Sequence, residues 1–70
     1  MKFEIVIHKP HKTITKYANT VNDINMRVGS TLINNGIDKG LAIKCSRWCQ
    51  TAVDGDSYNT EKFDLYVSKE

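Results

Sequence analysis

The sequence predicts one α+β domain spanning residues 1–70, with element order ββααβ and a three-stranded, mostly antiparallel sheet carrying both helices on one face. Three observations support this prediction. Apolar and polar residues alternate near both ends of the chain, as in half-buried strands. Two stretches between these ends have apolar residues at helical spacing. The length of 70 residues, with 40% hydrophobic and 26% charged residues, suits a single small core.

The first strand is predicted over residues 3–8, followed by a break at Pro10, which cannot donate to a sheet ladder. The β-branched and aromatic run over residues 13–17 predicts a second strand that closes a hairpin, with a loop as the alternative. A final strand is predicted over residues 63–68, and we expect the first strand to be central. The residues expected to face the helices are Phe3, Ile5, Ile7, Phe63, Leu65 and Val67.

The first helix is predicted to begin after Thr20, which with Asp23 resembles a capping box, and to end at Asn34-Asn35-Gly36. Gly29, in its middle, is interpreted as a point of close packing. The apolar residues at helical spacing are Val21, Ile24, Val28 and Leu32.

The second helix is predicted over residues 41–53, with Asp38 as its cap, although Leu41, Ile43 and Cys45 alternate like a strand. We expect Trp48 to be buried between this helix and the sheet. Asp54-Gly55-Asp56-Ser57 is a predicted turn. The expected apolar face is Leu41, Cys45, Trp48, Cys49, Ala52 and Val53.

The composition favours a cytoplasmic location. No apolar run approaches the roughly 20 residues that span a bilayer. Glu4 and the shortness of the first apolar run argue against a signal peptide. Two cysteines are too few for a secreted disulfide framework, so they are expected to be free thiols. The net charge of +2 is too small to indicate a partner class.

His8, His11, Cys45 and Cys49 are the residues that would hold a zinc ion if one were bound. Their spacing matches no standard zinc module, so we interpret the cysteines as structural thiols and expect neither metal nor cofactor. The segment 54–61 superficially resembles a calcium loop but lacks its third ligand, its central glycine and its distal bidentate glutamate.

Catalytic motifs are not recognisable in the sequence. It has no glycine-rich phosphate loop and no nucleophile elbow. Nothing in the sequence orients a histidine toward Cys49, as a Cys–His nucleophile would need. We therefore expect a protein that is not an enzyme.

The last third of the chain contains the pattern W-x3-A-x2-G-D-x-Y-x4-F, from Trp48 to Phe63, continued by Leu65 and Val67. This string resembles the ending of many small uncharacterised proteins of Gram-positive bacteria, their phages and mobile elements. The resemblance implies a helix, a tight Gly-Asp turn with an anchoring Tyr58, and a closing strand. It also implies an origin in a mobile element, and it brings no activity or catalytic residue.

The predicted fold leaves one sheet face uncovered, where Val6, Tyr17 and Tyr66 would project beside Glu4 and His8. Exposed aromatic residues on a flat surface are typical of a protein-binding patch, so an unidentified protein is the first expected partner. The oligomeric state is left open.

The alternative partner is a nucleic acid. It would bind the basic hairpin of residues 8–17, where Lys9, Lys12 and Lys16 would contact phosphates and Tyr17 would stack on a base. No membrane partner is expected.

Overall fold

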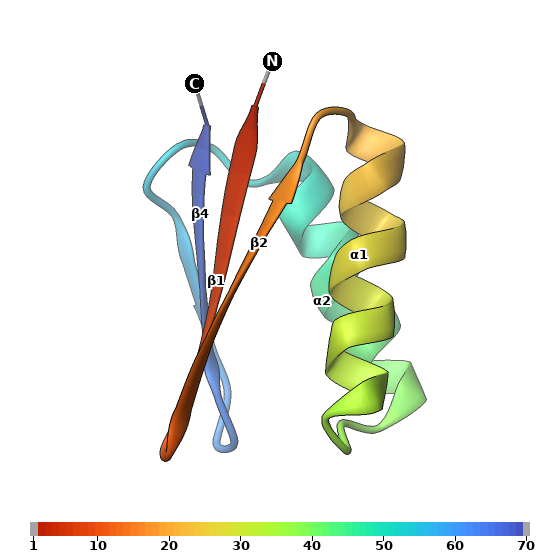
Figure 1. Ribbon diagram of the computed structural model, residues 1–70, viewed down its shortest axis with the longest axis vertical. Coiled ribbons are helices and arrows are strands. Elements are labelled where there is room, and N and C mark those ends of the chain that lie inside the picture. Colours follow the sequence, from red (N-terminus) through yellow and green to blue (C-terminus); the bar gives the residue numbers. More distant parts are fainter. Residues whose placement is uncertain (1, 70) are drawn as a thin grey trace.

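The computed structural model describes residues 2–69, and the chain folds in the order ββααββ (Figure 1). The elements are β1 (Phe3–Lys9), β2 (Lys12–Ala18), α1 (Val21–Asn34), α2 (Lys39–Thr51), β3 (Ser57–Asn59) and β4 (Asp64–Lys69). The predicted α+β class is confirmed, as are both helices and the hairpin. Neither α1 nor α2 combines the length and apolar character needed to cross a bilayer.

The strands form one antiparallel sheet in the order β2-β1-β4-β3, so β1 is internal as expected. The sheet has four strands rather than the predicted three. The additional strand arises because Ser57 pairs with Tyr66 and Asn59 pairs with Asp64. A three-residue strand of mostly polar residues has no apolar alternation, so its pairing depends on β4 being in place.

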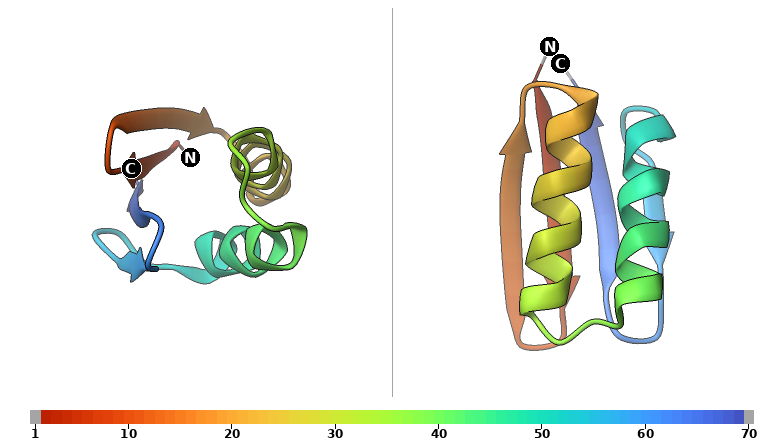
Figure 2. Two further views of the ribbon diagram at one scale, coloured as in Figure 1. Left: turned by 90° about the horizontal axis from the view of Figure 1, so that it is seen from below. Right: turned by 90° about the vertical axis from the view of Figure 1, so that its right-hand side faces the viewer.

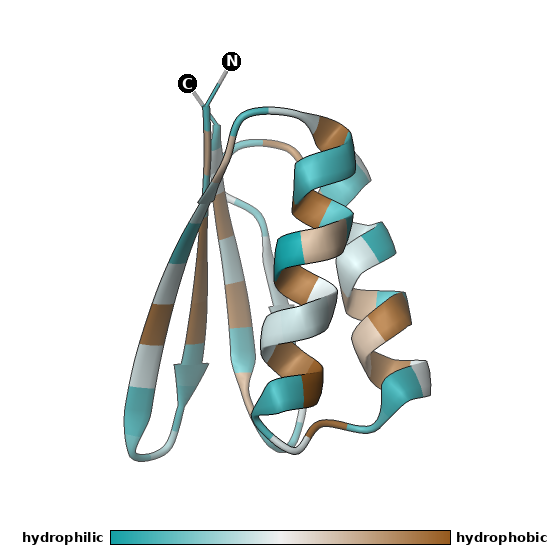
Figure 3. Cartoon of the chain, turned by 45° about the vertical axis from the view of Figure 1, so that its right-hand side comes forward, coloured by the Kyte–Doolittle hydropathy of each residue, from teal (hydrophilic) through white to brown (hydrophobic). Residues whose placement is uncertain are grey.

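Both helices cover the same face of the sheet, and the two termini lie beside each other at one end (Figure 2). Apolar bands recur along the strands and along the helices (Figure 3). The six sheet positions expected to face the helices are all buried. Within residues 2–69, the buried hydrophobic residues that form the core are Phe3, Ile5, Ile7, Ala18, Ile24, Val28, Leu32, Ile37, Ala42, Cys45, Cys49, Ala52, Phe63, Leu65 and Val67.

Helix α1 begins and ends as its sequence predicts. The Thr20 hydroxyl accepts a hydrogen bond of 3.1 Å from the Asp23 backbone N–H, which satisfies one of the unpaired donors of the first turn. Gly36 has φ +83°, a left-handed conformation that favours glycine and ends the helix. Val21 leaves the predicted apolar face and is exposed, because it lies in the first turn.

The interpretation of Gly29 as a close-packing position is wrong. A Cβ atom placed on Gly29 would meet no heavy atom within 4 Å outside the helix's own backbone. The missing side chain therefore makes room for no neighbouring element.

Helix α2 is capped by Asp38, whose Oδ2 accepts hydrogen bonds from the N–H groups of Gly40 (3.0 Å) and Leu41 (3.3 Å). Its buried face is formed by Ala42, Cys45, Ser46 and Cys49. These small side chains let the helix pack closely against α1.

Trp48 lies at the margin of this face and is only half-buried, so the expectation of a buried Trp48 is wrong. Its ring packs against Tyr58, with ring centroids 5.3 Å apart and an interplanar angle of 52°. Val53 is 63% exposed because α2 ends at Thr51, before the apolar face reaches it.

Candidate functional site

The sheet face opposite the helices is not covered by any element within residues 2–69 (Figures 1 and 2). We call this surface the open face. It consists of every second residue of the four strands, and the strand register arranges them in three rows. The rows are Tyr17–Glu4–Ser68, Thr15–Val6–Tyr66–Ser57 and Thr13–His8–Asp64–Asn59.

The three residues predicted to bind a partner do share the open face. Tyr66 lies directly opposite Val6 in the β1–β4 ladder, and Tyr17 lies in the neighbouring row, opposite Glu4. Tyr17 is 49% exposed and Tyr66 is 43% exposed. Because β2 and β4 flank β1, the backbones that carry the two tyrosines are separated laterally by about 10 Å. Val6 lies between these strands and is half-buried.

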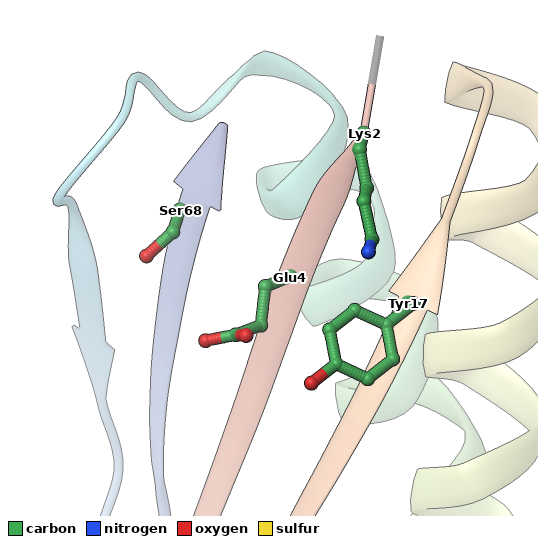
Figure 4. A pocket seen from close by; sticks show the side chains of 4 residues that line it. All are labelled: Lys2, Glu4, Tyr17 and Ser68. Atoms are coloured by element: carbon green, nitrogen blue, oxygen red, sulfur yellow. The ribbon is translucent and has the colours of Figure 1, made fainter. Parts of the chain in front are cut away.

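One end of the open face contains a shallow hollow of about 200 Å³, lined by Lys2, Glu4, Tyr17 and Ser68 (Figure 4). The Lys2 ammonium nitrogen lies 5.0 Å from the centroid of the Tyr17 ring, a cation–π contact that supports the orientation of the ring. The hollow is smaller than the roughly 300–1,000 Å³ of typical small-molecule sites. Sequence reasoning did not include Lys2, although the alternation shared with Glu4 and Val6 places it on this face.

The other end of the open face is polar. His8 Nδ1 lies 2.9 Å from Thr13 Oγ1, and Asp64 is the register partner of His8 on β4. Hydroxyl and amide groups border the apolar centre of the open face, which is formed by Val6 and Tyr66. They belong to Thr13, Thr15, Ser57 and Asn59. Ser57 and Asn59 belong to β3, which the sequence analysis did not predict as a strand, so these two polar groups of the open face were not predicted either.

The four residues considered for zinc do not converge. His8 is on the open face and His11 is in the exposed β1–β2 turn, whereas Cys45 and Cys49 are buried beneath α2 on the other side of the sheet. No group of three or more His, Cys, Asp or Glu residues within the described chain has a geometry that would hold a metal ion.

Burial also makes both thiols chemically inert. Burial raises the pKa of the Cys49 thiol from 9.0 to about 12, and the neighbouring Cys45 adds to this effect. Burial likewise raises the pKa of Cys45, partly opposed by the positive charge of Lys44. Since thiolates are the forms that bind metals and attack electrophiles, these neutral thiols are suited to packing.

Two carboxylates of the loop that resembles a calcium site accept hydrogen bonds from backbone N–H groups of the fold. Asp54 Oδ1 accepts a hydrogen bond of 2.8 Å from the Lys69 N–H, and Asp56 Oδ2 accepts one of 3.1 Å from the Val53 N–H. The Asp54 carboxylate therefore attaches the turn to the end of β4, whereas the Asp56 carboxylate makes a hydrogen bond within the turn.

The basic hairpin does not present its lysines beside Tyr17. Lys9, Lys12 and Lys16 lie on the helix side of the sheet, because they alternate with the open-face residues of β1 and β2. The Lys9 ammonium donates a hydrogen bond of 3.3 Å to the Asn35 carbonyl oxygen. The expected combination of phosphate-binding lysines and a stacking Tyr17 on one surface is therefore wrong.

Comparison with known proteins found no family model that matches the chain, and no curated protein or solved structure that matches it.

Proposed function

We propose that this protein is a small, non-enzymatic protein-binding domain and that the open face is its binding surface. The observation that carries the proposal is the position of two half-exposed tyrosines beside Val6 on a sheet face with no covering element in residues 2–69. Tyrosine offers a large and rigid contact area at low conformational cost, and it is enriched among residues that dominate binding energies.

The composition around the tyrosines supports a protein partner. Threonine, serine and asparagine side chains border the apolar centre, and adaptable polar groups of this kind accompany tyrosine in antibody binding sites. Among the residues that the structure describes, the charged ones on this face are Lys2, Glu4 and Asp64, so this part of the surface has no excess of positive charge with which to attract phosphates. Tyr17 and Tyr66 therefore lie in a nearly neutral environment.

The biological setting that we propose rests on the pattern from Trp48 to Phe63. Its resemblance to proteins of phages and mobile elements of Gram-positive bacteria favours an accessory factor that occupies a host protein. Two buried free thiols are compatible with the reducing cytoplasm, which is the compartment we propose.

The test is quantitative affinity capture from a Gram-positive host lysate with three baits: the parent protein, Tyr66→Ala, and a triple variant with Lys9, Lys12 and Lys16 changed to Ala. Tyr66→Ala should retain the fold, because its neighbours Leu65 and Val67 supply the core contacts of β4. It should weaken the captured partner by about 2 kcal/mol, or roughly 30-fold. The triple variant should retain the partner.

Circular dichroism and melting curves control for the fold of each bait. If the lysine variant loses the partner while Tyr66→Ala retains it, the hairpin is the functional surface, and nucleic-acid binding becomes the better proposal if the captured partner is a nucleic acid. If neither change affects capture, the binding surface lies on the helices and the proposal fails.

A further inference from the structure

The two edge strands of the sheet, β2 and β3, differ in length. At the β3–β4 edge, β3 has only three residues, and the loop before it continues the hydrogen bonding to β4. The Gly55 N–H donates to the Val67 carbonyl oxygen (2.8 Å), and the Val67 N–H donates to the Asp56 carbonyl oxygen (3.1 Å). With the bond from the Lys69 N–H to Asp54, the side of β4 that faces away from β1 is hydrogen-bonded over most of its length, and the edge strand on this side is the three-residue β3, which is too short to offer a long ladder.

The edge strand on the other side is longer: within the described residues, β2 pairs only with β1, over its seven residues. The hairpin has a two-residue turn, so its closing pair, Lys9 and Lys12, is a hydrogen-bonded pair. Along an antiparallel ladder, hydrogen-bonded pairs alternate with non-hydrogen-bonded pairs, whose backbone groups point away from the partner strand. The backbone N–H and C=O groups of Thr13, Thr15 and Tyr17 are therefore directed away from β1, toward the uncovered edge.

A groove of about 490 Å³ lies beside this edge, lined by Lys16 of β2 and by residues of α1. Lys16 and Arg27 supply two positive charges to its lining, Asp23 supplies one negative charge, and Met26 supplies an apolar wall. Lys12 lies on the same side of β2 as Lys16, four residues earlier in the strand. The groove and its strand therefore carry a net positive charge.

We propose that the β2 edge binds an extended, acidic segment of a partner protein by strand addition. The outward backbone groups of β2 would form the ladder, as in other cases of β-augmentation. The helix side of β2 reads Lys12, Ile14, Lys16, which is complementary to a segment reading acidic, apolar, acidic at every second position. This surface is distinct from the open face, and the inference does not rest on the function proposed for that face.

A second copy of this chain fits the edge poorly. Pairing β2 with β2 would bring the lysines of both strands together on the helix side of the extended sheet. Like charges on neighbouring strands are destabilising, and lysines on an edge strand are a known defence against such self-association.

The probe is the blocked peptide Thr-Glu-Thr-Val-Thr-Glu-Thr, which has the same side-chain order in both directions and so permits parallel or antiparallel addition. Titration into ¹⁵N-labelled protein should slow amide exchange at Thr13, Thr15 and Tyr17 and shift their resonances. The matched peptide with lysine in place of glutamate should bind the parent protein at least about tenfold more weakly than the acidic peptide does. The acidic peptide should likewise bind the Lys12→Glu/Lys16→Glu variant at least about tenfold more weakly than it binds the parent protein.

Backbone methylation of the peptide tests the ladder without altering the protein. Methylating the threonine nitrogens removes the donors of an antiparallel ladder, and methylating the glutamate and valine nitrogens removes those of a parallel one. Loss of binding with one of these two peptides, with Tyr66→Ala binding normally, supports the proposal. The proposal is overturned if the parent peptide does not bind at millimolar concentration, if neither methylated peptide is impaired, or if a single-stranded oligonucleotide displaces the acidic peptide from this edge.

Discussion

Replacing Gly29 with alanine should stabilise the protein. Gly29 lies in the middle of α1 with an ordinary negative φ, and an added methyl group would have no heavy atom within 4 Å beyond the helix's own backbone. Alanine is favoured over glycine in a helix interior by about 0.8–1.0 kcal/mol, largely because it restricts the unfolded chain. The methyl group gains little packing here, so the expected increase in unfolding free energy is about 0.5–1 kcal/mol.

Gly36 provides the matched control, because the same substitution there should have the opposite sign. An added methyl group at Gly36 would also meet no heavy atom within 4 Å, but this residue has φ +83°. Alanine in a left-handed conformation costs about 1–2 kcal/mol. The two variants thus differ in backbone conformation while sharing an open environment.

Urea denaturation followed by Trp48 fluorescence measures both effects, with equal m-values as the condition for comparing them. Each kcal/mol corresponds to about 4–8 °C in the melting temperature of a domain of this size. If Gly29→Ala is neutral or destabilising, α1 is distorted at this residue or another element packs against it. If Gly36→Ala is stabilising, the left-handed termination of α1 is incorrect.

Three further results are expected. Trp48→Ala should lower the unfolding free energy by about 2 kcal/mol, less than the roughly 3–5 kcal/mol expected for a fully buried tryptophan. A loss of roughly 3–5 kcal/mol would show that the side chain is fully buried. The raised pKa of Cys49 (9.0 to about 12) favours the folded state fully below pH 9, and this contribution is lost progressively as the pH rises toward 12. The unfolding free energy of the parent should therefore fall more steeply above pH 9 than that of Cys49→Ala, and parallel curves would contradict the assignment. Adding EDTA should leave the melting temperature unchanged. The interpretation of Cys45 and Cys49 as structural thiols would be wrong if native mass spectrometry showed a stoichiometric zinc ion and its removal unfolded the chain.

Local sequence patterns were sufficient to predict most of the elements and the composition of both sheet faces. The alternation in β1 and β4 depends only on the two-residue period of a strand, so it identified Val6 and Tyr66 as open-face residues before any pairing was known. Thr20 and Asp38 were recognisable as caps because their hydrogen bonds are made to residues two or three positions away. The same alternation would have separated Lys16 from Tyr17, since neighbouring strand residues point to opposite faces.

Other features depended on contacts between residues far apart in the sequence. Ser57–Asn59 became a strand only because β4 supplied a partner, and the loop before it extended the hydrogen bonding along β4 through Val67 and Lys69. The small residues of α2 set how that helix packs, which left Trp48 half-buried against Tyr58. Local periodicity thus determined which residues form each element and face, because those preferences act within a few residues. Tertiary structure decided how deeply Trp48 is buried and which strands form the edges of the sheet, because both depend on which distant segments come into contact.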